Sequence, residues 1–201
     1  EEEKMQKACE VAGKEPIFRS LPYQKKKAGI VTTGSEVYYH RIEDKFTPVV
    51  IEKLKECGVT EVKQIQCNDD HEMITEAIQT LIDDGSDLIV CTGGMSVDPD
   101  DRTPLAIKNA CTEVVTYGAP VLPGAMFMLA YCEKEGRQIP VMGLPGCVMY
   151  AKRTIFDLVL PRIMCDEKLH EKDFWLLGQG GLCLSCPVCT FPNCGFGKGG
   201  Y

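Results

Sequence analysis

The chain has 201 residues, of which 44% are hydrophobic and 25% charged, and its formal net charge at pH 7 is −7. This size and balance are typical of one well-buried α/β domain with short additions at its ends. The negative total argues against a nucleic-acid partner held by a basic face. No apolar run approaches the roughly 20 residues that a membrane span needs, so no membrane partner is expected either.

The lack of a recognisable leader and the pattern of cysteines predict a cytoplasmic protein. No positive-then-apolar leader of the secretory type opens the sequence, which begins with Glu1. We therefore expect residues 1–26 to be the end of a truncated upstream region. In a reducing compartment, most of the scattered cysteines act as small apolar core residues. The eight concerned are Cys9, Cys57, Cys67, Cys91, Cys111, Cys132, Cys147 and Cys165.

Taken in chain order, the segments alternate between strand-like and helix-like patterns. Residues 1–13 form a charged helix, and an extended linker follows up to residue 26. Apolar spacing and turn residues predict strands at 28–32, 59–67, 87–91, 113–118 and 138–143. Helices are predicted at 44–57, 68–85, 103–111, 121–136 and 148–164, with one or two further turns at 170–178.

This alternation indicates right-handed βαβ crossovers and a mostly parallel sheet with helices on both faces. The fold class is therefore α/β, a three-layer sandwich over residues 27–177, followed by a tail rich in Gly and Cys at 178–201. Ligands of such folds bind at the carboxyl ends of the strands. The residues directly after each strand are thus the first place to look for a site.

Three predicted strands end in glycine-containing turns, at residues 32–36, 91–96 and 143–147. Glycine allows close approach of a ligand, and backbone N–H groups in such turns favour a phosphate. Lys152 and Arg153, about one turn into the next predicted helix, would add positive charge. Hydroxyl donors are available from Thr32, Thr33, Ser35, Thr92 and Ser96. Each turn taken alone is more simply explained as a plain loop, and it is the occurrence of three at one sheet edge that favours a site.

Carboxylates gather at the same strand ends. Asp98, Asp100 and Asp101 share one loop, and Glu36 and Asp44 flank the first turn. Carboxylates beside an anionic ligand would repel it unless a hard cation such as Mg²⁺ lies between them. Asp101 is the main candidate for chemistry, whereas Asp98 and Asp100 are equally explained by a solvated turn. Asp69 and Asp70, after the second strand, are either ligands or caps of the next helix.

The order "TTGSEV", "IED", "NDD", "TGGMSVDPDD" and "LPGC" resembles the molybdopterin-binding domain over about residues 27–165. That domain is shared by molybdopterin adenylyltransferase, molybdopterin molybdotransferase and the competence-damage proteins. The resemblance implies a three-layer α/β fold and a pterin dithiolene phosphate bound across the sheet edge. It places Asp101 as the essential acid, which holds magnesium or molybdate. It assigns ligand binding to Gly34, Ser35, Glu36, Asp44, Thr92, Gly93, Gly94, Ser96, Leu144, Pro145 and Gly146. To these we add Thr33, Asp70, Asp98 and Cys147 as candidate ligand contacts.

The resemblance implies a transferase of molybdenum cofactor biosynthesis, and its molybdotransferase branch inserts molybdate into adenylated molybdopterin with release of AMP. Three alternatives stay open: an adenylyltransferase that uses MgATP, a non-catalytic module that binds or delivers molybdopterin, and, as the weakest, a nucleotide pyrophosphatase-like activity as in the competence-damage relatives. Cys147-Val148, which stand where the molybdotransferase turn has Asn-Pro, favour the second alternative. The implied partners are molybdopterin or its adenylate, molybdate and ATP or AMP. Relatives with this fold form homodimers or homotrimers.

Four further cysteines crowd into the tail as C-x2-C-x2-C-x4-C: Cys183, Cys186, Cys189 and Cys194. Three cysteines at two-residue gaps resemble the bacterial ferredoxin run, which favours a [4Fe–4S] cluster. Four thiolates also suit tetrahedral Zn²⁺. Disulfides or free thiols are the simpler alternative. Cys147 lies in a glycine turn at a predicted helix start, where a thiolate would be stabilised.

Overall fold

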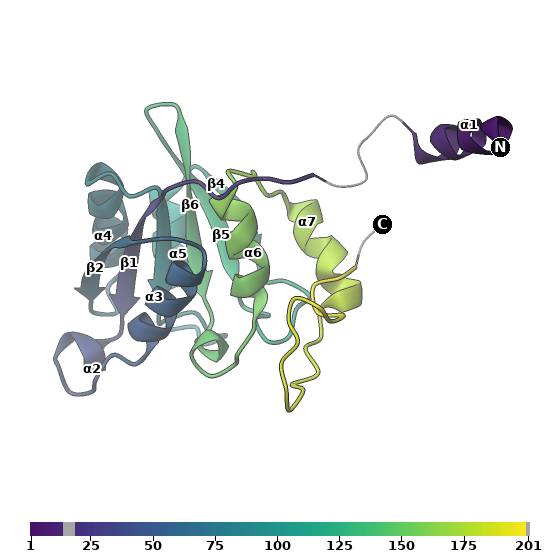
Figure 1. Cartoon of the computed structure of the whole chain (residues 1–201). Helices are drawn as coiled ribbons and strands as arrows, with labels where there is room; N and C mark the ends of the chain where they lie inside the picture. Colours follow the sequence, from purple (N-terminus) through teal and green to yellow (C-terminus); the bar gives the residue numbers. More distant parts are fainter. Residues whose placement is uncertain (14–18, 200–201) are drawn as a thin grey trace.

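A computed structural model describes residues 1–13 and 19–199 (Figure 1). Its centre is one six-stranded sheet with the strand order β2-β1-β3-β6-β5-β4. The strands are β1 (Lys27–Thr33), β2 (Glu61–Cys67), β3 (Leu88–Thr92), β4 (Glu113–Tyr117), β5 (Met128–Lys134) and β6 (Arg137–Leu144). The α-helices are α1 (Glu2–Ala12), α2 (Ser35–Tyr38), α3 (Phe46–Glu56), α4 (His71–Asp83), α5 (Thr103–Ala110), α6 (Ile155–Met164) and α7 (Glu171–Trp175). Two short 3₁₀ helices are η1 (Gly146–Met149) and η2 (Leu176–Gly180).

The register of the sheet brings four strand ends together. Strand β1 pairs in parallel with both β2 and β3, and β3 pairs in parallel with β6. Thr32 lies opposite Thr92, which in turn lies opposite Leu144. Strand β5 runs antiparallel to β6 and to β4. The mostly parallel α/β sandwich is therefore confirmed, with one antiparallel strand inserted near the sheet's edge.

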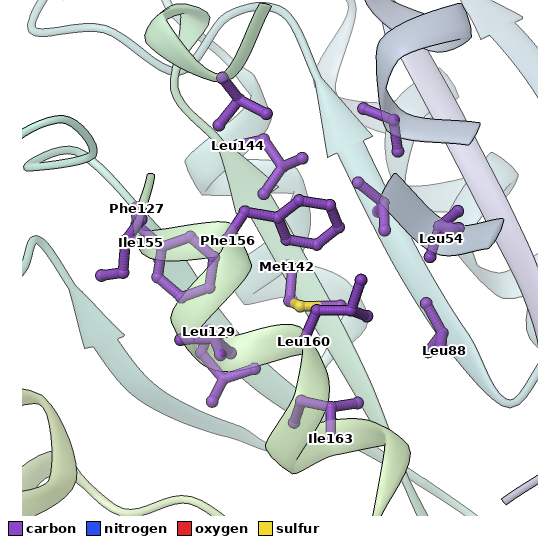
Figure 2. Close-up of a cluster of buried hydrophobic side chains, with 14 of the residues drawn as sticks. Leu54, Leu88, Phe127, Leu129, Met142, Leu144, Ile155, Phe156, Leu160 and Ile163 are labelled. Atoms are coloured by element: carbon purple, nitrogen blue, oxygen red, sulfur yellow. The ribbon is translucent and has the colours of Figure 1, made fainter. Parts of the chain in front are cut away.

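Alternating side chains of the strands build a core on each face of the sheet. On one face Leu88 and Val90 pack with α3 and α6, and on the other Ile89 and Cys91 pack with α4 and α5. Figure 2 shows the first of these cores, in which Phe156 of α6 lies over Met142 of β6. Because both faces are covered, β3 is buried along its whole length and reads Leu-Ile-Val-Cys without alternation of apolar and polar residues. The covered faces leave the strand ends as the place for a ligand.

The segment 121–136 is a loop and a strand, so the prediction of an apolar helix there is wrong. Residues 127–132 are all buried, because β5 lies between two strands and under helices on both faces. A continuous apolar run is compatible with either a buried helix or a buried strand. The turn that follows distinguishes the strand from the helix. Glu135 and Gly136 both have positive φ, and Lys134 pairs with Arg137 across this two-residue hairpin.

The predicted helix 148–164 is also divided. The structure has η1 first and then α6, which begins only at Ile155. Thr154 caps α6, because its hydroxyl accepts a hydrogen bond from the Phe156 N–H and Asp157 accepts one from the Thr154 N–H. This capping box fixes the start of the helix. Lys152 and Arg153 consequently lie in the connection before α6 and not one turn inside a helix.

At the N-terminus, the helix predicted at 1–13 is present as α1, none of whose residues is buried. Of the predicted linker, residues 14–18 lie outside the described residues. Residues 19–26 have no regular structure, and the Gln24 N–H donates to the Met164 carbonyl oxygen at 2.7 Å. Within the described part of the chain, no helix is long and apolar enough to cross a membrane.

Candidate functional site

The three glycine turns lie at one edge of the sheet. Register alignment puts the ends of β1, β3 and β6 side by side, so the turns that follow Thr33, Thr92 and Leu144 are neighbours. The turn after β2 lies at the same edge, because Thr33 is paired with Cys67. The sequence-based prediction of a shared edge is thus matched by the strand order.

The first and second turns interlock through buried threonines. The Thr33 hydroxyl donates to the Thr92 carbonyl oxygen at 3.1 Å, and Thr103 donates to the Gly93 carbonyl oxygen at 2.9 Å. Gly93 has φ +86°, and a Cβ there would lie 2.3 Å from the Thr33 carbonyl oxygen. Only glycine tolerates both conditions. Gly94, with φ +55°, is similarly confined by the Thr103 hydroxyl at 2.8 Å.

A cavity of about 570 Å³ opens beside the second and third turns. Its lining comes from Met95–Val97, from Pro145–Cys147, from the loop 122–126 between β4 and β5, and from Leu182 and Cys183 of the tail. Gly34, Ser35 and Glu36 of the first turn do not line it. The second and third turns therefore meet around one cavity, while the first turn supports it from the neighbouring strand end.

Two parts of this site were not predicted from the sequence. The loop 122–126 supplies one wall of the cavity, although residues 121–136 are predicted as a turn and helix. A signal was present, because Leu122-Pro123-Gly124 repeats the Leu144-Pro145-Gly146 triplet of the third turn. The other part is Tyr117 at the end of β4, whose hydroxyl donates to the Ser96 carbonyl oxygen at 3.4 Å.

Among the acids of the second turn, Asp101 is the one whose carboxylate contacts the cavity wall. Its carboxylate accepts a hydrogen bond from the N–H of Ser96, a residue of the cavity wall. Asp98 instead accepts from the Asp100 N–H at 3.0 Å, which closes a local turn. Burial, and then the negative charge of Asp101, raise the pKa of the Tyr117 phenol. Asp101 and Tyr117 therefore flank Ser96, whereas Asp98 and Asp100 are exposed turn residues.

The carboxylates near the first turn have mainly local hydrogen-bonding roles. Asp44 accepts from the Phe46 and Thr47 N–H groups and from the Gln64 amide, at 2.9 to 3.0 Å. Burial by itself would raise the pKa of Asp44, but these bonds outweigh it and the pKa is lowered. Asp70 caps α4 by accepting from the Glu72 and Met73 N–H groups. Asp70 thus serves as the helix cap, which was one of its two predicted roles.

Asp69, the neighbour of that cap, is tied to the first turn. Its carboxylate accepts from the Ser35 N–H at 2.9 Å and from the Ser35 hydroxyl at 2.8 Å. Glu36 is exposed, and its carbonyl oxygen accepts from the Arg41 N–H at 2.8 Å. The first turn is therefore held from the end of β2, with Ser35 already engaged by a protein carboxylate.

The donor groups at this edge and in the tail do not form a closed metal site. In the described ranges 1–13 and 19–199, no three His, Cys, Asp or Glu side chains gather closely enough to hold one ion. Cys186 and Cys189 are exposed and Cys183 and Cys194 half-buried, all as free thiols. The four tail cysteines as they lie here do not fit a preformed iron–sulfur or zinc site. Asp101 would supply Mg²⁺ with a single carboxylate ligand, so substrate oxygens and water would have to complete the coordination of the ion.

Two further side chains at this edge, Cys147 and Thr92, have unexpected properties. Burial, partly offset by backbone hydrogen bonds, raises the pKa of the Cys147 thiol, which is opposite to the thiolate stabilisation expected for this turn. The Thr92 hydroxyl is completely buried and has no hydrogen-bond partner in the described part of the chain. Such a buried unsatisfied group is unusual and marks this strand end.

Comparison with known proteins identifies the family. The family model described as "Probable molybdopterin binding domain" matches residues 29–164. The CinA-like protein of Mycobacterium avium (strain 104) is 35% identical over 95 residues, 47% of this chain and 22% of that protein. That of Mycobacterium sp. (strain MCS) is 35% identical over 85 residues, 42% of this chain and 20% of that protein. This chain therefore spans about a fifth of the length of these curated relatives.

Solved structures agree in fold. The tungsten cofactor synthesizing protein MoaB from Pyrococcus furiosus has a TM-score of 0.58 at 19% identity, over 72% of this chain and 99% of that one. The molybdopterin biosynthesis enzyme MoaB from Thermus thermophilus has a TM-score of 0.54 at 21% identity, over 69% and 91%. The family match covers the whole sheet edge described above, including all three glycine turns. The chain belongs to the family of probable molybdopterin-binding domains of molybdenum cofactor biosynthesis.

Proposed function

We propose that this chain binds molybdopterin in the cavity at the sheet edge and promotes insertion of molybdate into the adenylated pterin, with release of AMP. The observation that carries the proposal is the meeting of the second and third glycine turns around one cavity of about 570 Å³. That volume lies within the range of small-molecule sites. The cavity also lies where ligands of open α/β sheets bind.

The lining suits a pterin that carries a phosphate. Met95, Met126 and Pro145 offer apolar surface for a planar ring system. Gly146 and Cys147 open η1, where backbone N–H groups lack partners within the helix and can donate to an anion. The molybdopterin phosphate would bind there, which leaves the dithiolene to face Ser96 and Asp101.

Asp101 is the proposed catalytic residue. Its carboxylate is fixed by the Ser96 N–H at the wall of the cavity. From there it can accept a proton, or hold a hard cation beside the phosphate and the incoming molybdate. Mg²⁺, when bound, would neutralise the charge shared by these anions. Asp100 lies one residue away, yet its side chain is exposed and forms none of these contacts.

The test is AMP release from adenylated molybdopterin in the presence of molybdate. Asp101→Asn keeps an oxygen that can accept the Ser96 hydrogen bond but removes the charge, so we expect turnover to fall by at least about 100-fold. Asp100→Asn makes the same chemical change in the same loop and should retain nearly full turnover. Equal turnover in the two variants would remove Asp101 from the mechanism.

A second candidate is a non-catalytic module that binds or delivers molybdopterin. One observation favours it: among the described residues, no carboxylate side chain lines the cavity itself. In that case adenylated molybdopterin binds tightly, no AMP is released with or without molybdate, and Asp101→Asn leaves the affinity unchanged. The same pair of measurements therefore separates the two functions, and formation of adenylated molybdopterin with release of pyrophosphate from molybdopterin and MgATP would identify an adenylyltransferase.

A further inference from the structure

The tail packs against the domain through its residues 180–198. The Leu122 N–H donates to the Gly181 carbonyl oxygen at 2.6 Å, and the Cys183 N–H donates to the Leu122 carbonyl oxygen at 2.8 Å. Phe196 is 4% exposed and belongs to the core on the α6 face. A Cβ at Gly181 would lie 2.0 Å from the Pro120 carbonyl oxygen. The glycines of the tail thus serve close packing.

The packed tail encloses a second cavity of about 540 Å³. Its other wall is the connection 150–153 between η1 and α6. Pro123, Leu182 and Cys183 line both this cavity and the first one, so the two are adjacent. All four tail cysteines line it, as do the rings of Tyr150, Phe191 and Phe196. The thiols and rings make a polarisable, mostly apolar surface.

Positive charge lies on one side of this cavity. Lys152 and Arg153 are part of the lining, and no acidic residue lines it in the described part of the chain. Arg153 is held in place, because its Nη1 contacts Glu56 at 2.7 Å and Asp157 at 2.8 Å. Its guanidinium also lies 5.3 Å from the centre of the Phe191 ring. Glu56 and Asp157 offset part of the Arg153 charge, so the exposed Lys152 is the main unpaired cation.

We propose that the second cavity binds a planar aromatic anion of the nucleoside monophosphate class. The base stacks on Phe191 and Tyr150, and the phosphate is held by Lys152 with Arg153 beside it. Aromatic rings bind any base through its face, and a lysine binds phosphate as a point charge. This inference deepens the proposed function. It rests on the proposed function only for the identity of the natural ligand. A nucleotide here would lie next to a pterin in the first cavity.

The arrangement argues against reading the tail as a preformed metal site. The four thiols surround a space of about 540 Å³, whereas Zn²⁺ needs four ligands converging at about 2.3 Å. Two of the thiols are exposed and two are half-buried, so no common centre is enclosed. In this account the cysteines are part of the lining around an organic ligand.

AMP alone, titrated calorimetrically into the full chain, tests the proposal. We expect one molecule per chain. Gly195→Leu should abolish binding, because Gly195 lines the second cavity and a Cβ there meets nothing within 4 Å. Phe191→Leu keeps an apolar side chain but removes the ring, and should weaken affinity on the order of tenfold. Lys152→Ala should weaken it several-fold, with Lys108→Ala on the exposed side of α5 as the matched control.

Alkylation of the exposed thiols gives an independent measurement. Iodoacetamide should modify Cys186 and Cys189 in the free protein, and AMP should slow both modifications while leaving exposed Cys9 unaffected. Absence of AMP binding at millimolar concentration, or an affinity unchanged by both Gly195→Leu and Phe191→Leu, would overturn the proposal. So would one Zn²⁺ bound per chain with all four tail thiols protected. Molybdopterin affinity, measured separately, reports on the first cavity, so either inference can fail alone.

Discussion

At the scale of single residues, Gly93 and Gly146 have opposite roles. Gly93 has φ +86° and no room for a Cβ, whereas Gly146 has no positive φ and would place a Cβ in open space. We predict that Gly93→Ala lowers the free energy of unfolding by about 2–4 kcal/mol, from strain and from collision with Thr33. Gly146→Ala should change it by less than about 0.5 kcal/mol. Urea unfolding of both variants checks this, and equal stabilities would contradict it.

Asp44 gives a pH dependence whose sign follows from its contacts. Because its pKa is lowered in the folded protein, it stabilises the fold above the unfolded value of about 3.9 and ceases to do so as pH falls through the folded pKa. We predict that wild type loses more stability than Asp44→Asn between about pH 5 and pH 3. Urea midpoints measured across that range should converge at low pH. Parallel curves would show that the carboxylate contributes nothing.

Residue types at the site were predictable to different degrees. The glycines of the three turns and Asp101 follow from their positions after strands. The roles of Asp69 and Asp70 could not be separated, because adjacent carboxylates differ only in direction: one caps α4 and the other holds Ser35. Tyr117 was missed since its contact with Ser96 depends on how β4 aligns with β3 across the sheet.

At the scale of elements, a buried ion pair joins α3 to α6. Lys53 contacts both oxygens of Asp157 at 2.7 and 2.9 Å, and both side chains are under 10% exposed. Lys53→Met removes one of the two cations that contact the buried Asp157 carboxylate and leaves Arg153 as the other, so it should cost about 3 kcal/mol of unfolding free energy, the lower end for a broken buried pair. Lys63→Met, which breaks an exposed pair with Asp84, should cost less than about 1 kcal/mol. A similar loss in both variants would refute the distinction.

Most elements follow from local patterns, and the exceptions have physical causes. Strands β1, β2 and β3 and helices α3 and α4 carry clear spacing and turn signals, and each lies where it was predicted. Strand β5 was misread because its burial on both faces erases the alternation of a strand. The early start given to α6 overlooked the Thr154–Asp157 capping box.

At the scale of the whole molecule, the tail forms part of the domain's packing. Phe196 belongs to the core on the α6 face, so Phe196→Ala should lower the unfolding free energy by about 3 kcal/mol. Val188, which is 76% exposed in the same tail, should tolerate Ala with a change under about 0.5 kcal/mol. Thermal unfolding of the full chain measures both. No shift for Phe196→Ala would mean that the tail does not stabilise the domain.

The two cavities lie next to each other and share part of their lining. The first is built mainly by turns of the matched family region, and the second by Pro123 and residues 150–153 of that region together with residues 179–196, which follow it. No pattern in the sequence could place these cavities side by side, because their shared wall joins Pro123 to Cys183 across 60 residues. Local patterns predicted the turns at 91–96 and 143–147, but neither the wall 122–126 nor the adjacency of the two cavities.

Equilibrium binding of molybdopterin to the wild type and to two matched variants tests the central claim most directly. Gly146→Leu fills the first cavity and Gly195→Leu the second, and at both positions a Cβ meets no atom within 4 Å. We predict that Gly146→Leu weakens molybdopterin binding at least about 100-fold, whereas Gly195→Leu retains it. Unchanged affinity in Gly146→Leu, with the fold verified by its unfolding midpoint, would contradict a pterin site at this sheet edge.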